Sequence, residues 1–505
     1  MTTLSHYKPL ALLCALAIGV VGCDLSSVDS EPLTGFCAVD ASAFGCPESG
    51  TVYDTLGADI NGRTVIEVTD RQGGIGGALS GAAHSTVTWS NNFTYLLDGA
   101  VFVNSGQTLV IEPGTIIRGH PGQGRNSSAL IVARGGRIEA NGTAEAPIIM
   151  TAINDDVTDP SDLLQAGGPA QGEWGGLIVL GAAPTNIAEG ETPIEGLDAT
   201  DPRGLYGGSD PNDDSGVLRY VSIRHGGTLI GAGNEINGLT LGAVGAGTTI
   251  EYIEIFANQD DGIEWFGGTA RAKYLLVSYS GDDMFDYDLG YSGLNQYVLG
   301  IMDVGFGDNG AEQDGGDSDL GGAAGEAATP LATPVFANVT YIGQGVDEGG
   351  RAMTFRDNAG GQYWRSVFYD FENGVRIEDR EGEGDSRARA EAGDIRFTDV
   401  LFSNVVSASP TFDEVFAYYE DAPEGDTAVD LVDLTGPFNF GASGLSVQRS
   451  QGGPLSLSTS SVGAPTVPFP AAVADFFEET DFVGAVGDNN WIEGWTALSQ
   501  YHAVN

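Results

Sequence analysis

The chain of 505 residues carries 70 acidic and 21 basic side chains, which gives a formal net charge of −49 at pH 7. This charge excludes nucleic acid and anionic lipid surfaces as partners, because both require basic patches. Lys8 and Lys273 are the only lysines. So few basic residues indicate halophilic adaptation, since in 1 M salt the Debye length is about 3 Å and an acidic surface no longer repels itself. The alternative interpretation is that the excess of acidic side chains serves to bind calcium.

The N-terminal residues predict export. An apolar run from Leu10 to Val21 follows Lys8 and ends before Cys23. The run is shorter than the roughly 20 residues that cross a bilayer, so we expect residues 1–22 to be a signal peptide. Val20 to Cys23 resemble the lipobox of bacterial lipoproteins. The resemblance implies lipid attachment at Cys23 and an exported protein anchored to a membrane, with the outer membrane or cell surface as the expected place. An ordinary cleaved signal is the alternative.

Residues 23–62 are expected to form a lipidated tether, which contains Cys37 and Cys46. A disulfide between these two cysteines suits an oxidising compartment. Two unrelated free thiols are the alternative interpretation.

Internal repeats predict the fold. The 76 glycines indicate many tight turns between short strands. Leu109, Ile111, Gly114 and Ile116 recur 22 residues later as Ile131, Ala133, Gly136 and Ile138, and Ile253, Ile255, Ile263 and Trp265 recur 22 residues later as Leu275, Val277, Phe285 and Tyr287. This period favours an all-β, right-handed parallel β-helix with about 22 residues per coil and coils about 4.8 Å apart. A β-sandwich pair or a propeller is the rival architecture.

A local pattern marks four candidate rungs in one register. It consists of Asn or Asp, usually Gly, and then apolar-x-apolar, and it begins at Asn237, Asp261, Asp283 and Asn373. We place the β-helix at 63–406, with long Gly- and Asp-rich loops at 154–173, 186–216 and 305–334 and a charged excursion at 380–394. The C-terminal region, 407–505, repeats weakly and is expected to be a cap that covers exposed strand edges.

Five segments resemble a group of large, uncharacterised bacterial surface lipoproteins with a parallel β-helix-like repeat domain. The segments are Tyr95 to Gly99, Ile111 to Thr115, Gly204 to Gly208, Asn258 to Glu264 and Asn490 to Thr496. The resemblance implies an exported β-helix-like protein and does not imply an activity.

An acidic strip in the middle rungs is the main candidate site. Asp260 and Asp261 lie one 22-residue period before Asp282 and Asp283, and Glu264 lies one period before Asp286. Carboxylates stacked about 4.8 Å apart repel each other, which a bound cation, a shared proton or solvation would offset. Calcium is the cation expected, since it prefers oxygen ligands. The candidate metal ligands are all six residues, and the candidate catalytic residues are Asp261, Asp282 and Asp283.

An enzyme that cleaves polysaccharide, a hydrolase or a lyase, is one hypothesis for this strip. The spacing of Asp and then Asp-Asp resembles that of polygalacturonase-type β-helix hydrolases, in which two carboxyl groups act as acid and base. Those enzymes continue with His-Gly and Arg-x-Lys. Here His225 precedes the acids, and Arg376 is followed by Ile377 and Glu378. A lyase would need a base such as Arg271 or Arg356.

The function that we expect is therefore binding or adhesion, with a glycan, another envelope component or a surface protein as partner. Six aromatic residues, Trp174, Trp265, Tyr279, Tyr291, Tyr363 and Trp364, would either stack on sugar rings or pack in the core.

Overall fold

The computed structural model describes residues 52–504 except 71–72, 77–84, 123–126, 166–167, 232–233, 317–326, 381–384, 420–426 and 429–431. The predicted signal peptide, Cys23 and the cysteine pair Cys37 and Cys46 lie outside the described residues. Within them, no helix is long and apolar enough to cross a membrane.

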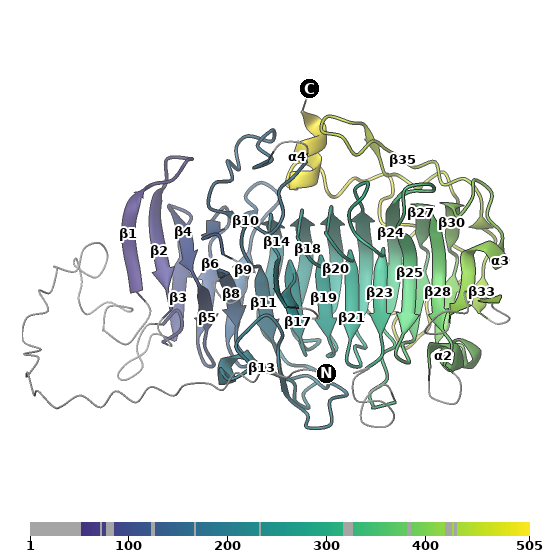
Figure 1. The fold of residues 1–505 in the computed structure, drawn as a ribbon, viewed down its shortest axis with the longest axis horizontal. Helices are drawn as coiled ribbons and strands as arrows, with labels where there is room; N and C mark the ends of the chain where they lie inside the picture. The colour runs from purple at the N-terminus through teal and green to yellow at the C-terminus, as the bar shows by residue number, and fades with distance from the viewer. Residues whose placement is uncertain are drawn as a thin grey trace, which may run out of the picture.

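The chain winds into a parallel β-helix, whose coils stack along the long axis of the molecule (Figure 1). One face is an 11-stranded sheet. Its strands are β5 (Ala100–Val103), β8 (Ala129–Val132), β11 (Leu177–Leu180), β17 (Leu239–Gly242), β19 (Ile263–Phe266), β21 (Phe285–Asp288), β23 (Ala311–Asp314), β25 (Arg351–Arg356), β28 (Asn373–Glu378), β31 (Phe416–Tyr419) and β32 (Thr427–Ala428).

The remaining faces belong to a 19-stranded sheet. Its strands are β1 (Val52–Ala58), β2 (Thr64–Thr69), β3 (Thr86–Trp89), β4 (Phe93–Asp98), β6 (Thr108–Ile111), β7 (Ile116–Gly119), β9 (Arg137–Asn141), β10 (Ile148–Ala152), β14 (Gly216–Arg224), β18 (Thr249–Phe256), β20 (Arg271–Ser278), β22 (Leu294–Ile301), β24 (Val335–Gly345), β26 (Gly361–Trp364), β27 (Val367–Phe371), β29 (Ile395–Thr398), β30 (Leu401–Val405), β33 (Asp433–Thr435) and β34 (Asn439–Phe440).

Among the described residues, the elements outside these two sheets are few and short. They are three two-stranded pairs, β12 (Thr192–Pro193) with β13 (Leu205–Tyr206), β15 (Thr228–Gly231) with β16 (Asn234–Ile236) and β35 (Ser446–Val447) with β36 (Leu455–Ser456), the 3-10 turn η2 (Pro202–Gly204), and the helices α2 (Ser386–Ala392), α3 (Phe412–Val415) and α4 (Ala497–Ala503).

A corner divides the long strands of the 19-stranded sheet into two faces. Tyr252 and Tyr274 mark it in β18 and β20, with φ values of 56° and 60°. Tyr220 and Tyr297 take the same left-handed conformation in β14 and β22. Non-glycine residues rarely adopt this conformation. Here their rings stack from coil to coil, with centroids 4.2 to 4.6 Å apart, so aromatic packing offsets the backbone strain.

The middle coils confirm the 22-residue period. Ile253 pairs with Leu275, and Ile263 pairs with Phe285. All four predicted rungs lie in the 11-stranded sheet, in β17, β19, β21 and β28. Inward residues such as Trp265 are buried in the core, while the alternating residues face outward.

The 22-residue pairing predicted for the first repeat is wrong. Leu109 pairs with Ile138 and not with Ile131, because β6 neighbours β9, whereas β8 belongs to the other sheet. The same sequence of strand, glycine turn and strand occurs at successive corners of a coil. Local similarity therefore does not specify which face of the coil a strand joins.

The 19-stranded sheet includes strands on both sides of the range 63–406. β1 pairs antiparallel with β2 before this range, and β33 and β34 pair in parallel with β29 and β30 after it. The C-terminal segment, defined here as residues 441–504, covers the flank of the coils. Leu498 and Val483 in this segment pack in one apolar cluster with Phe256 and Leu299 of the strands. Figure 1 shows α4 lying above the middle coils.

Candidate functional site

The predicted acidic strip is assembled on the outer face of the 11-stranded sheet. Glu264 of β19 pairs in register with Asp286 of β21, and Asp286 pairs with Glu312 of β23. Their neighbours in the sheet, such as Trp265 and Tyr287, point into the core. Alternation along a strand therefore places these three acidic side chains on the same outer side of successive coils.

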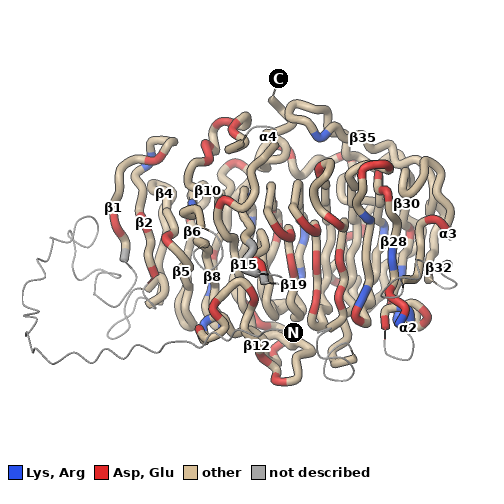
Figure 2. Tube along the Cα trace, viewed as in Figure 1, with Lys and Arg blue, Asp and Glu red and all other residues tan. Residues whose placement is uncertain are grey.

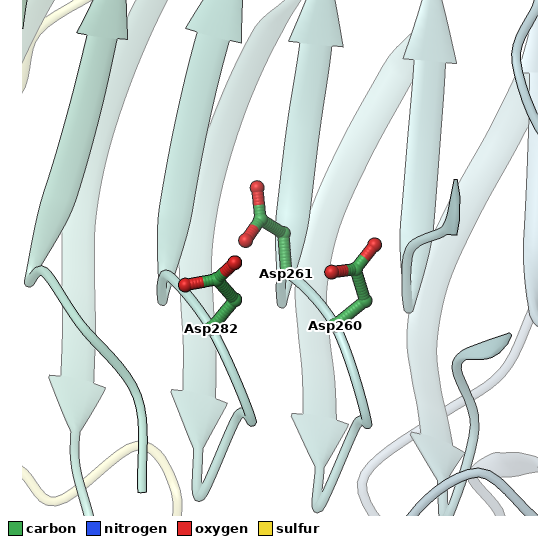
Figure 3. A group of neighbouring side chains, drawn as sticks. All are labelled: Asp260, Asp261 and Asp282. Atoms are coloured by element: carbon green, nitrogen blue, oxygen red, sulfur yellow. The ribbon is translucent and has the colours of Figure 1, made fainter. Parts of the chain in front are cut away.

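Asp260 and Asp261 lie at the turn before β19, and Asp282 lies one coil further along (Figure 3). The side chains form two groups that share Asp261. One group is Asp260, Asp261 and Asp282, and the other is Asp261, Glu264 and Asp286. Within each group, carboxylate oxygens lie within 4.8 Å of one another. Asp282 is exposed, whereas the other members are buried.

Asp283 is brought to the strip but has a structural role. Its backbone N–H donates to Asp261 Oδ1 at 2.8 Å, and its own carboxylate accepts from the backbone and side-chain amides of Asn309 on the next coil. Each of these carboxylates thus ties its coil to the following one. Asp283 belongs to neither of the two carboxylate groups.

Loops bring two further carboxylates to the strip. Glu195 lies in the predicted loop 186–216, and Glu235 belongs to β16. Both act electrostatically on Asp260. The 22-residue period does not predict these two residues, because they lie outside the repeat and their positions depend on how the loops fold back.

Burial and mutual repulsion favour the neutral forms of the strip carboxyls. Burial, followed by the charge of Glu235, raises the pKa of Asp260 to about 8. The same causes raise the pKa of Glu195 to about 7. Burial also raises the pKa values of Asp261, Glu264 and Asp286 well above their ordinary range, and neighbouring carboxylates add to the effect. Bound protons would relieve this repulsion, and so would a bound cation.

An arginine-rich cleft of about 550 Å³ continues the strip toward the C-terminal coils. Its lining combines Tyr419 with four arginines and four acidic residues, which are Arg351, Arg356, Arg376, Arg380, Asp308, Glu312, Asp357 and Glu378. The whole chain has only 21 basic residues, so four arginines in one cleft are a strong concentration. Figure 2 shows acidic residues on successive middle strands and basic residues nearer β28.

Ion pairs and ring contacts arrange the side chains of the cleft. Arg356 contacts Glu312 at 2.8 Å and Asp314 at 2.7 Å. Arg380 contacts Glu378 at 2.8 Å. The guanidinium of Arg376 lies 3.9 Å from the ring centre of Tyr419. These contacts hold several planar donors along one wall, an arrangement that suits hydroxyl and carboxylate groups of a ligand.

The other residues considered for catalysis or sugar stacking lie elsewhere. His225 is 2% exposed, and its Nδ1 lies 2.7 Å from the carbonyl oxygen of Ala170, so it faces a different part of the fold. Arg271 lies near Phe476 of the C-terminal segment. The aromatic residues are buried, as the core-packing alternative predicted, and this group comprises Trp174, Trp265, Tyr279, Tyr291, Tyr363 and Trp364.

A parallel β-helix with a charged outer groove defines the class of this protein. Residues 81–429 match the model of the pectate-lyase-like β-helix domain, and the chain belongs to this family. No curated protein matches the chain. One solved structure aligned with it is the catalytic domain of a GH87 α-1,3-glucanase in complex with tetrasaccharides. The two are 12% identical with a TM-score of 0.17, and the alignment covers 65% of this chain and 64%, less than two thirds, of that one.

Proposed function

We propose that the protein is an exported lipoprotein, anchored through Cys23, that binds carbohydrate in the arginine-rich cleft. The observation that carries this proposal is the cleft itself, where four arginines, four acidic residues and Tyr419 line about 550 Å³ on the outer face of the solenoid. In a concave site, a small number of polar groups that converge on a ligand fix its orientation. Membership of a pectate-lyase-like family supports a sugar as that ligand.

The arginines favour a glycan that carries carboxylate or sulfate groups. Guanidinium groups form paired hydrogen bonds with such anions. The overall charge of −49 would repel an anionic chain from most of the surface, so binding is confined to the cleft and depends on its basic residues.

A glycan array probed with the mature lipid-free protein tests this proposal. We expect uronate-containing or sulfated glycans to bind, and an Arg376→Gln, Arg380→Gln double variant to lose at least about tenfold in affinity, because charged hydrogen bonds each contribute about 1.5–3 kcal/mol. Arg219→Gln is the control, since Arg219 pairs with Glu251 on another face. Equal binding by both variants would contradict the proposal.

Cleavage of a polysaccharide is the second candidate function. It is favoured by Asp260, whose pKa of about 8 keeps it protonated at neutral pH through burial and the charge of Glu235, as a general acid requires. Release of new reducing ends from a bound glycan, abolished in Asp260→Asn, would establish it. If the protein binds a glycan but releases no new reducing ends, it acts in binding alone.

A further inference from the structure

The two carboxylate groups of the acidic strip share Asp261 and thereby form one continuous cluster. It comprises Asp260, Asp261, Glu264, Asp282 and Asp286, with oxygens within 4.8 Å inside each group. Asp261 and Glu264 are each 8% exposed, and Asp286 is 9% exposed. Nearly dry carboxylates at this spacing repel one another strongly, because little water screens them.

Two buried oxygens at this cluster lack a hydrogen-bond partner among the described residues, which is a second observation in favour of a bound ion. Asp286 Oδ1 is buried and accepts no hydrogen bond from any residue that the structure describes. The same holds for Oδ1 of Asn237, a neutral side chain that is 1% exposed. The amide nitrogen of Asn237 donates to Glu264, so this second oxygen sits beside the cluster. Buried oxygens of this kind are rarely left without a partner in native structures.

We infer that the cluster binds a divalent cation, and that the cation is Ca²⁺. Its ligands would be carboxylate oxygens of Asp261, Glu264 and Asp286, with Asp260 and Asp282 on the side that faces solvent. Ca²⁺ takes 6–8 oxygen ligands in flexible geometry, whereas Mg²⁺ demands a near-octahedral set. An all-oxygen cluster without histidine or cysteine disfavours transition metals. The exposed Asp282 leaves a route for the ion to enter.

This site is separate from the proposed glycan cleft, although the two are neighbours. Asp286 pairs in register with Glu312, and Glu312 contacts Arg356 at the edge of the cleft. The cation would neutralise the acidic end of the groove and leave the arginines unchanged. Cation binding and glycan binding can therefore be measured independently.

Calorimetric titration of the chelator-treated mature protein with CaCl₂, at constant ionic strength in KCl, tests the inference. We expect one site, a rise in Tm on adding Ca²⁺, and weak competition by Mg²⁺. Terbium luminescence excited through tryptophan offers a second readout, because Trp265 lies in the same strand as Glu264. Absence of both binding heat and a Tm rise would overturn the site, and equal competition by Mg²⁺ would overturn the choice of ion.

Variants separate a bound cation from a shared proton. Asp286→Asn and Glu264→Gln should each weaken Ca²⁺ binding by about 100-fold, since affinity follows the number of charged ligands. In chelator at alkaline pH, where the strip carboxyls lose their protons, both variants should be more heat-stable than the parent, because one repelling charge is removed. This gain also shows that they fold. Glu251→Gln is the control outside the cluster, and unchanged Ca²⁺ affinity in Asp286→Asn and Glu264→Gln would overturn the inference.

Discussion

Glu254 accepts a hydrogen bond from the backbone N–H of Leu498 at 2.9 Å, across 244 residues of sequence. Its other oxygen accepts from the N–H of Ala497 at 2.8 Å and from the hydroxyl of Ser222 at 2.6 Å. The side chain of a central strand thus satisfies the first N–H groups of α4, which have no partner within the helix. This contact fastens the C-terminal segment to the solenoid.

Replacing Glu254 by Ala should loosen that segment. We expect a loss of about 3 kcal/mol in the free energy of unfolding, because buried donors are left unpaired. Limited proteolysis should then cut within 441–504 sooner than in the parent protein. Glu493→Ala, a change at an exposed residue of the same segment, is the control. Equal cleavage rates in the two variants would refute a fastening role.

The tyrosine corner should be sensitive to loss of its rings. Tyr252 stacks on Tyr220 at 4.3 Å and on Tyr274 at 4.2 Å. Tyr252→Ala should lower the free energy of unfolding by about 3–4 kcal/mol, since ring packing is lost while the left-handed backbone remains. Tyr252→Phe keeps the ring and should lose much less. Chemical denaturation measures both variants, and similar losses would disprove a stacking contribution.

Without divalent cations, heat stability should fall as the pH rises from about 5 to about 8. The folded-state pKa is about 7 for Glu195 and about 8 for Asp260 and Glu312, with burial as the main cause. The unfolded chain releases these protons near pH 4, so the folded state holds more protons in this window and loses stability as the pH rises. Calorimetry in chelator should show Tm decreasing by roughly 5 °C. A flat or rising Tm would contradict this expectation.

Membrane attachment depends on Cys23 in our proposal. Cys23→Ala should abolish incorporation of radiolabelled lipid and move the protein out of the membrane fraction. Several buried acyl chains anchor stably because each CH₂ contributes about 0.8 kcal/mol. Cys37→Ala is the matched control. Label retained in Cys23→Ala would exclude this residue as the attachment site.

The sequence predicted the fold where consecutive coils contain no insertion. From Ile253 to Tyr287 each inward residue recurs after 22 positions, and the strands pair accordingly. Val87 still pairs with Leu109 after 22 residues, but the coil that follows Leu109 is longer, so there the same period aligned strands of different faces. Periodicity therefore specifies a coil only where the lengths of all its turns are constant.

The candidate site was predictable to the same extent. Asp261, Glu264 and Asp286 follow from the period, because register alone places them on neighbouring coils. Glu195 and Glu235 reach the strip from loops, which no repeat describes. The arginine-rich cleft was missed, although Arg376 occupies the outward position of a predicted rung between Val375 and Ile377. Comparing outward positions across all rungs would have pointed to it.

The position of the C-terminal segment has a consequence for biogenesis. Phe256, Leu299 and Ile342 belong to strands in the middle of the chain, yet their apolar outer face is covered by Leu457, Val483 and Leu498. Coils assembled in the order of synthesis would expose this face to other chains until the last segment arrives. The fold is therefore completed late in synthesis. Chains that lack the C-terminal segment are expected to aggregate.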